Sequence, residues 1–503
     1  MKTREEWAAA AAEQTKSFKT RCYIGGAFVE PRSEKTFDCI NPATGRALVQ
    51  VAAGDVRDID AAVSSARAAF ERGLWRNMPP RRRGQVLLRL ADLIEHHRDE
   101  LALLETLDIG KPIRYTDRVD LEQCVYTLRW FGELADKLYD EMAPTPPHVV
   151  GLITREPVGV VGVITPWNFP MMITAWKIAP ALVTGNSVVL KPAEQSPLSA
   201  LRIAELAREA GVPPGVFNVV PGDGESAGKP LALHDDVDAI AFTGSTAVGK
   251  KLLTYAGESN MKRVSLETGG KTPNIIFADA PDLGFALRAV GFSTFWNTGQ
   301  MCVAGSRLLV ERSRHDEVVE RLAAVAADWL PGDPLDPASK AGPLVDSEQL
   351  ATVTRYIELG KSEGAALVYG GARALEQSGG YFVQPTIFSG VQNEMSIARD
   401  EIFGPVLSVI PFDDEAEALR IANDTRYGLS AALWTSNLAR AHRVSAALRA
   451  GTVWVNNFDQ ADMTAPFGGF KASGNGGKDK SKWAVDKYTN LKTTWINIGK
   501  GGR

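Results

Sequence analysis

The feature that most constrains the fold is a series of short apolar strands that alternates with helical segments between residues 159 and 242. Residues 159–165 (GVVGVIT) are uncharged and rich in β-branched side chains, which is typical of a strand buried on both faces. Further strands are expected at 187–190, 215–220 and 238–242, with a helix over 196–210 between the first two of these. This βαβ order predicts a mainly parallel, doubly wound α/β sheet.

A second set of alternations begins after about residue 270. Residues 274–280 (NIIFADA) and 451–458 (GTVWVNNF) resemble strands and have helical segments between them, so the sequence predicts two α/β domains. Residues 488–498 (YTNLKTTWINI) alternate apolar and polar side chains, and no helix follows. Such a terminal strand needs a neighbour, either within the chain or in another subunit.

Composition excludes several classes of protein. The chain has 56 basic and 60 acidic residues, a net charge of −4, which gives no electrostatic footprint for nucleic acid. No apolar run approaches the ~18 residues that cross a membrane. The four cysteines are too few and too scattered for a disulfide framework or a zinc site. We therefore expect a cytoplasmic protein with no metal, no nucleic-acid partner and no membrane contact.

The loop after the last of these strands (FTGSTAVGKK) comes within one residue of a triphosphate-binding loop. Gly244 and Gly249 are spaced correctly, but Lys251 stands where a Ser or Thr would ligate magnesium. A helix from about Val248 would direct backbone N–H groups at an anion. The middle glycine of the dinucleotide fingerprint is absent, so a turn that merely begins a helix is an equal alternative from these residues alone. Upstream, Lys191 and Glu194 leave the carboxyl end of a strand, where such sheets bind ribose; an exposed Lys/Glu pair is the alternative.

Three residues carry possible chemistry. Cys302 lies on a loop flanked by glycines, where a thiolate can be exposed near backbone donors. Glu267 ends a strand before two glycines, and a carboxylate there can serve as a general base for water. Asn168 lies between Pro166 and Pro170, which would hold its amide in place as an oxyanion donor. The alternatives are a structural cysteine and a structural turn carboxylate.

Seven segments, in this order and rough spacing, resemble the NAD(P)-dependent aldehyde dehydrogenase superfamily: VITPWNFP, LKPAEQSPLSA, FTGSTAVGKK, LETGGKTPN, GQMCVAGSR, EIFGPVLSV and PFGGFKASG. The resemblance covers residues 20 to 500 and implies two doubly wound Rossmann-like domains with a small β oligomerisation element. It places the dinucleotide-binding domain at 1–137 and 157–267, the catalytic domain at 268–471, and the oligomerisation element at 138–156 and 484–503. A homodimer or homotetramer is expected.

The resemblance also implies a mechanism. Cys302 would attack an aldehyde to form a thiohemiacetal, whose oxyanion the Asn168 amide and the Cys302 N–H would bind. After hydride transfer to the nicotinamide, Glu267 would activate water to hydrolyse the thioester, with Lys177 in the proton relay. Lys478 stands where the family usually has Arg, so contacts that depend on a bidentate Arg are in doubt.

NAD is the expected cofactor, with NADP tolerated, because the Glu194 carboxylate would accept a bond from a 2′-hydroxyl and repel a 2′-phosphate. The residues expected around the cofactor are Ile164, Thr165, Pro166, Trp167, Lys191, Glu194, Gly224, Phe242, Thr243, Gly244, Ser245, Val248, Glu267, Thr268, Gly269, Glu401 and Phe403.

Segments such as DMTAPFGGFKASGNG and DKYTNLKTTWI are most similar to the γ-glutamyl-γ-aminobutyraldehyde dehydrogenase branch, which implies an ω-amino or γ-glutamylamino aldehyde of polyamine degradation. A cationic tail favours carboxylates and aromatic walls, although for each acid taken alone a solvated surface charge is the favoured interpretation. The residues expected around the substrate are Phe169, Trp176, Asp120, Gln123, Trp296, Met301, Val303, Asp459, Asp462 and Phe467, with Glu122 beside Asp120. A broad-specificity aldehyde dehydrogenase is the nearest alternative; a nucleotide triphosphatase and a non-catalytic binding protein are more distant ones.

Overall fold

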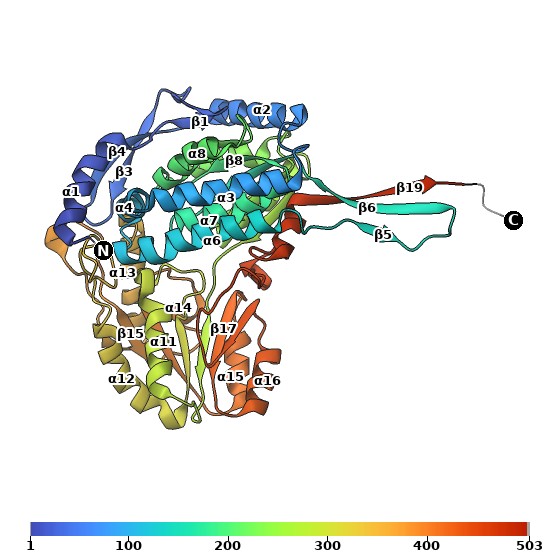
Figure 1. Ribbon diagram of the computed structural model, residues 1–503. Coiled ribbons are helices and arrows are strands. Elements are labelled where there is room, and N and C mark those ends of the chain that lie inside the picture. The colour runs from blue at the N-terminus through green and yellow to red at the C-terminus, as the bar shows by residue number, and fades with distance from the viewer. Residues whose placement is uncertain (1, 500–503) are drawn as a thin grey trace.

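The computed structural model describes residues 2–499 and shows two α/β lobes with a long β-arm that projects from the first (Figure 1). The sheet of the first lobe has seven strands in the order β11-β10-β7-β8-β9-β1-β2, and its first five strands are parallel. In that order, the strands are Arg263–Glu267, Ala239–Thr243, Val160–Ile164, Ser187–Lys191, Phe217–Val219, Cys22–Ile24 and Ala27–Val29.

Burial explains why the first lobe is doubly wound. Every residue of β7 and β8 is buried, and apart from Lys191 at the end of β8 both are uncharged and largely β-branched, as the sequence predicts. One face packs against α3 (Pro80–His96), α6 (Glu122–Leu134), α7 (Pro170–Val183) and α8 (Leu198–Ala210). The other face packs against α2 (Val56–Arg72), α9 (Lys229–Leu233) and α10 (Thr246–Glu258).

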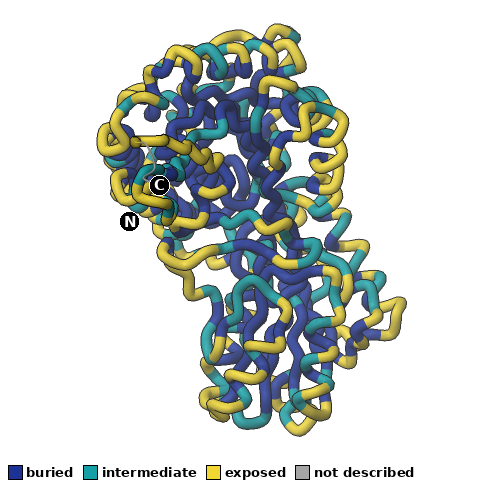
Figure 2. Tube along the Cα trace, turned by 90° about the vertical axis from the view of Figure 1, so that its right-hand side faces the viewer, coloured by how far each residue is buried: buried dark blue, intermediate teal, exposed yellow. Residues whose placement is uncertain are grey.

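The second lobe repeats this architecture with a different set of strands, in the order β14-β15-β16-β13-β12-β17-β18. These are Ala366–Tyr369, Thr386–Ser389, Val406–Phe412, Arg307–Glu311, Pro273–Ile276, Ser430–Trp434 and Thr452–Val455. All are parallel except the edge strand β14. Helices α11 (Leu283–Phe295) and α12 (His315–Ala327) cover one face. On the other face lie α13 (Ser347–Ser362), α15 (Glu415–Asn423) and α16 (Leu438–Ala447). The predicted pair of doubly wound sheets is confirmed, and in Figure 2 buried segments run through the middle of both lobes.

The terminal strand finds its neighbour within the chain. β19 (Thr489–Asn497) pairs antiparallel along its whole length with β6 (Val149–Pro157), and β5 (Glu141–Ala143) completes the arm. Eight of the nine β19 residues are exposed, including Leu491 and Trp495 at 64% each. The domain limits proposed above stay predictions. Across residues 2–499, every helix is too short or too polar to cross a bilayer.

Candidate active site

The loop that carries Cys302 joins α11 to β13, and its backbone is strained. Asn297 and Thr298 have φ of 49° and 55°, and Gly299 continues the left-handed run at 71°. Each side chain in this conformation costs roughly 1–2 kcal/mol, so contacts from outside the loop must hold it. The Thr298 hydroxyl donates to the carbonyl of Gly342 at 2.9 Å. The loop is therefore fixed before any ligand arrives.

A glycine brings the candidate base close to this loop. β11 ends at Glu267, and the chain then passes under Cys302 through Gly270. A Cβ atom at Gly270 would lie 2.2 Å from the Cys302 carbonyl oxygen, a distance that no side chain tolerates. The second glycine of LETGG is thus required for the two segments to pack together.

Asn168 is tied directly to the nucleophile loop. Its Nδ2 donates to the carbonyl of Gln300 at 2.9 Å, and the Asn297 side chain donates back to the Asn168 carbonyl at 3.2 Å. A side-chain amide has two N–H donors. One holds Asn168 in place, and the role of the second as an oxyanion donor stays a prediction.

Glu267 is buried, and this determines its charge. Its Oε2 accepts the Gly469 N–H at 3.3 Å, while Oε1 is enclosed without a partner among the described residues. Burial raises the pKa of this carboxyl to about 8; the negative Asp479 adds to the rise, and Lys177, Lys487 and Lys478 oppose it. A group that gains its charge near neutral pH is well matched to general-base catalysis.

Lys177 belongs to a charge cluster close to Glu267. Its Nζ donates to Asp479 Oδ2 at 2.6 Å, and Lys487 pairs with the other oxygen of the same carboxylate. Lys177 and Asp479 are at most 1% exposed, so the three residues form a buried charge cluster near Glu267. The sequence prediction missed Asp479; its one signal was an acid between two lysines of the KDK segment.

Lys478 does make a contact that orders this loop. Its Nζ donates to the Gly468 carbonyl at 2.9 Å, next to Glu267. The lysine thus binds a backbone oxygen with a point charge, where a guanidinium would have offered a two-pronged donor.

Cys302 is half-buried, and its thiol is protonated in this arrangement. Burial raises its pKa to about 12, and the carboxyl groups of Glu401, Glu267 and Asp459 add to the rise. Reaction at this sulfur therefore requires a nearby group that takes its proton or a positive charge that stabilises the thiolate.

A groove of about 270 Å³ opens at the carboxyl ends of β7, β8 and β10. Predicted cofactor residues that line it are Ile164, Thr165, Pro166, Trp167, Lys191, Glu194, Gly224, Phe242, Thr243, Gly244, Ser245 and Val248. At its base α10 begins, with the Ser245 hydroxyl accepting the Val248 N–H at 3.3 Å.

The groove fits a dinucleotide. The N-terminus of α10 favours phosphate oxygens, and the Thr243 hydroxyl beside it is buried without a partner among the described residues. Lys191 Nζ donates to Glu194 at 2.9 Å, so a donor and an acceptor for ribose hydroxyls lie together at the other end.

The remaining predicted cofactor residues lie outside this groove: Glu267, Thr268, Gly269, Glu401 and Phe403. They lie toward the nucleophile. Glu401 accepts the Gly270 N–H at 2.9 Å, and the Phe403 ring stands 5.2 Å from that of Trp167. Their role at the nicotinamide end stays a prediction.

Cys302 itself lines a second hollow, a cavity of about 250 Å³ with largely apolar walls. Predicted substrate residues that line it are Phe169, Trp176, Gln123, Trp296, Met301, Val303, Asp459, Asp462 and Phe467. Burial raises the pKa of Asp459 to about 6. Asp462 is exposed and accepts a bond from the Tyr126 hydroxyl at 3.1 Å.

The structure does not place Asp120 on this cavity, which corrects the prediction. Asp120 is fully buried and pairs with Lys111, whose Nζ lies 3.7 Å from the centre of the Phe169 ring. Val119 and Gln123, four residues apart, share the cavity face of this helical segment. Asp120, one residue after Val119, points away from the cavity and into the core.

Glu122 also lies away from the cavity, in a salt bridge with Arg98 at 3.0 Å.

The prediction also missed residues that do line the cavity. Trp454 comes from β18, where its pattern indicated only a strand. Lys480 comes from the segment after the Gly-rich turn, where a lysine indicates a surface position.

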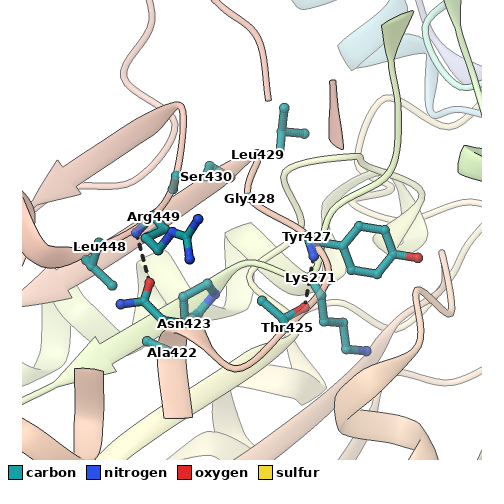
Figure 3. Close-up of a pocket in the computed structure, with 13 residues that line it drawn as sticks. Lys271, Ala422, Asn423, Thr425, Tyr427, Gly428, Leu429, Ser430, Leu448 and Arg449 are labelled. Carbon is teal, nitrogen blue, oxygen red and sulfur yellow. Dashed lines mark hydrogen bonds between the residues drawn. The ribbon is translucent and has the colours of Figure 1, made fainter. Parts of the chain in front are cut away.

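Another hollow, drawn in Figure 3, lies near the ends of α15 and α16 and the start of β17. Its volume is about 10 Å³, which is room for roughly one water molecule. Lys271 and Tyr427 are among its lining residues, and Cys302 is not. It holds neither an aldehyde nor a dinucleotide.

Comparisons with known proteins agree with this geometry. Residues 28–494 match the model of the family described as "Aldehyde dehydrogenase family". The chain is 51% identical to the NADP/NAD-dependent aldehyde dehydrogenase PuuC of Escherichia coli, over 96% of each chain. Two solved structures superpose with a TM-score of 0.97, cover 99% of this chain and are covered completely. One is a γ-glutamyl-γ-aminobutyraldehyde dehydrogenase from Burkholderia cenocepacia, at 55% identity, and the other is an indole-3-acetaldehyde dehydrogenase with NAD⁺, at 56%.

Proposed function

Because the chain belongs to the aldehyde dehydrogenase family, we propose that Cys302 is the nucleophile with which it oxidises an aldehyde to a carboxylic acid. The protein is an NAD(P)-dependent aldehyde dehydrogenase. One observation carries the assignment of the nucleophile: the Cys302 sulfur is on the cavity wall, on a loop held by Asn168 and packed against the Glu267 segment.

The first step is addition of the Cys302 sulfur to the carbonyl carbon. The thiol proton passes to water as the C–S bond forms, so Glu267 stays free to act as the base in the last step. The carbonyl oxygen becomes an oxyanion, which the free Asn168 N–H and the Cys302 backbone N–H bind. A thiohemiacetal on Cys302 results.

When bound in the groove, an oxidised nicotinamide supplies the acceptor for the hydride of that thiohemiacetal. Lys191 and Glu194 hold the adenosine ribose, and the α10 N-terminus faces the pyrophosphate. Glu401 and Phe403 position the nicotinamide end.

The last step returns the enzyme to its starting state. Glu267 takes a proton from water, and the resulting hydroxide adds to the Cys302 thioester. As the C–S bond breaks and the carboxylic acid leaves, Glu267 returns the proton to the Cys302 sulfur. The Lys177–Asp479–Lys487 cluster holds the charge around Glu267 constant while it gains and loses the proton.

The proposed substrate is an ω-amino or γ-glutamylamino aldehyde. Asp459 and Asp462 supply negative charge on a cavity that otherwise has aromatic walls. The names of the Burkholderia structure and of the Pseudomonas aeruginosa aminoacetaldehyde dehydrogenase, 50% identical to this chain, support this substrate class. The apolar lining and the indole-3-acetaldehyde dehydrogenase neighbour favour the second candidate, a broad aliphatic and aromatic specificity.

We also propose that the chain assembles as a homodimer or homotetramer through the β-arm. The exposed apolar side chains of β19 support this, because an arm that presents Leu491 and Trp495 to water gains stability when a second subunit covers them. The molar mass of the purified protein in solution, compared with that of a Trp495→Ser variant, tests it.

The test of function is absorbance at the reduced-nicotinamide band with an aldehyde panel. We expect reduction of NAD⁺ with aminoaldehydes and none by the Cys302→Ala variant. Equal rates for the two proteins would overturn the assignment of the nucleophile.

A further inference from the structure

We propose that Lys480 binds a carboxylate at the end of the substrate opposite the aldehyde, and so selects γ-glutamylamino aldehydes over aldehydes that carry only an ammonium. The inference rests on the proposed function and chooses between its two substrate classes.

Lys480 is a buried cation at the cavity without an ionic partner. The residue is 6% exposed and lines the same cavity as Cys302. Its Nζ lies 4.5 Å from the centre of the Trp176 ring and 5.5 Å from that of Phe467, both in the cavity wall. Within residues 2–499, no hydrogen-bond acceptor or carboxylate is at bonding distance from this nitrogen, and the atom is not sealed inside the protein. Its three N–H donors are therefore available to a ligand.

The position of Lys480 is built into the fold. Asp479, the residue before it, is paired with two buried lysines, and its backbone exchanges hydrogen bonds with Phe467 at 2.8 Å in both directions. Lys480 and Ser481 both have positive φ, 60° and 56°. Non-glycine residues in this conformation persist only where the surroundings impose it, and they cluster at ligand sites. The backbone thus fixes the start of the Lys480 side chain, and the contacts with the Trp176 and Phe467 rings place its ammonium.

The contacts of Lys480 with the Trp176 and Phe467 rings disfavour a substrate whose only charged group is an ammonium. An aminoaldehyde tail would seek the aromatic faces of Trp176 and Phe467, but Lys480 already occupies them. Two ammonium groups placed against the same rings repel each other in a site that excludes water. A carboxylate meets the opposite situation, since it gains charge-assisted hydrogen bonds from an ammonium that has already lost its water.

Asp459 and Asp462 then have a defined role. Asp459 lies within electrostatic range of both Lys480 and Cys302. A γ-glutamyl group ends in an α-ammonium beside an α-carboxylate, so one acid and one lysine match its two charges. A simple amine matches only the acid.

The experiment compares four aldehydes: butanal, 4-aminobutanal, 4-oxobutanoate and γ-glutamylaminobutanal. The first three share four carbons and differ in the charge at the far end. In the wild type, we expect KM to be lower for the two carboxylate-bearing aldehydes than for 4-aminobutanal. In Lys480→Met, we expect their KM to rise about 10- to 100-fold, the worth of a charged hydrogen bond. The KM of butanal should change far less, and that of 4-aminobutanal should fall.

Two further variants serve as controls. Lys482→Met removes an exposed lysine two residues away and should change no KM. Lys480→Arg keeps the charge and should keep the preference for carboxylates. If Lys480→Met does not fold, inhibition of the wild type with butanal as substrate gives the answer: succinate should compete, and 1,4-diaminobutane should not.

Two results would overturn the proposal: a lower wild-type KM for 4-aminobutanal than for 4-oxobutanoate, or an equal rise in KM for butanal and the carboxylates in Lys480→Met. Failure of the proposed function is distinct, since the wild type would then oxidise none of the four aldehydes.

Discussion

The cofactor groove, lined by Trp167, and the proposed substrate cavity, lined by Phe169 and Cys302, are built in different ways. The groove is made from strand ends and the start of one helix, so its donors are fixed by the sheet itself. The cavity is made from side chains of separate segments, including α6, α7, the nucleophile loop and the turns around 459–467 and 480. The groove therefore depends on the sheet, and the cavity depends on which side chains these segments carry.

Removing the Cys302 sulfur should abolish catalysis and leave cofactor binding intact. Cys302→Ala should lower turnover by about 10⁴-fold or more, because the nucleophile has no substitute. The Cys302 side chain does not line the groove, so the variant should bind NAD⁺ with unchanged affinity, measured by calorimetry. A large loss of NAD⁺ affinity would show that the two sites are not independent.

Glu267 belongs to neither site alone, and its effect should appear in kcat. Glu267→Gln should lower kcat roughly 10²- to 10⁴-fold, the usual worth of a general base. The pKa of about 8 gives the sign of the pH dependence: the basic form is present above that pH, so the wild-type kcat rises as pH approaches 8 from below. This rise should vanish in the variant; an unchanged pH profile would assign the base elsewhere.

A change confined to the groove should alter cofactor choice alone. Glu194→Gln removes the charge that repels a 2′-phosphate, so the ratio of kcat/KM for NADP⁺ over NAD⁺ should rise about tenfold. The KM for the aldehyde should stay the same in steady-state assays. An effect on the aldehyde instead would contradict the division into two sites.

We expect the smallest change in KM from a substitution at Asp462, an exposed residue of the cavity wall. Asp462 is exposed, and its pKa is lowered by bonds from Thr464. In Asp462→Asn, screening by water should limit the rise in KM for 4-aminobutanal to roughly two- to fivefold. Equal changes for 4-aminobutanal and hexanal would remove Asp462 from substrate recognition.

The same contrast explains what the sequence predicted. The β-branched run of β7, the turn at 243–245 and the Lys191/Glu194 pair are local features, and the structure gathers them in one groove. The cavity depends on contacts between distant segments. Lys480 is placed by the pairing of Asp479 with Lys177, 302 residues away, which no local pattern reveals.

The prediction that Asp120 lines the cavity was wrong for a related reason. A π-helical turn over Thr116–Leu121 alters the phase of the helix, so spacing in the sequence does not tell which of two nearby polar side chains reaches the cavity. Gln123 does so, and Asp120 stabilises the core behind Phe169 through Lys111.

The most direct test of Cys302 as nucleophile is to trap the acyl-enzyme. The Glu267→Gln variant, mixed with NAD⁺ and an aldehyde, quenched in acid and digested, should show the peptide containing Cys302 heavier by the acyl group. Acylation of a different residue, or reduction of NAD⁺ in the first turnover with no acylated peptide at all, would contradict it.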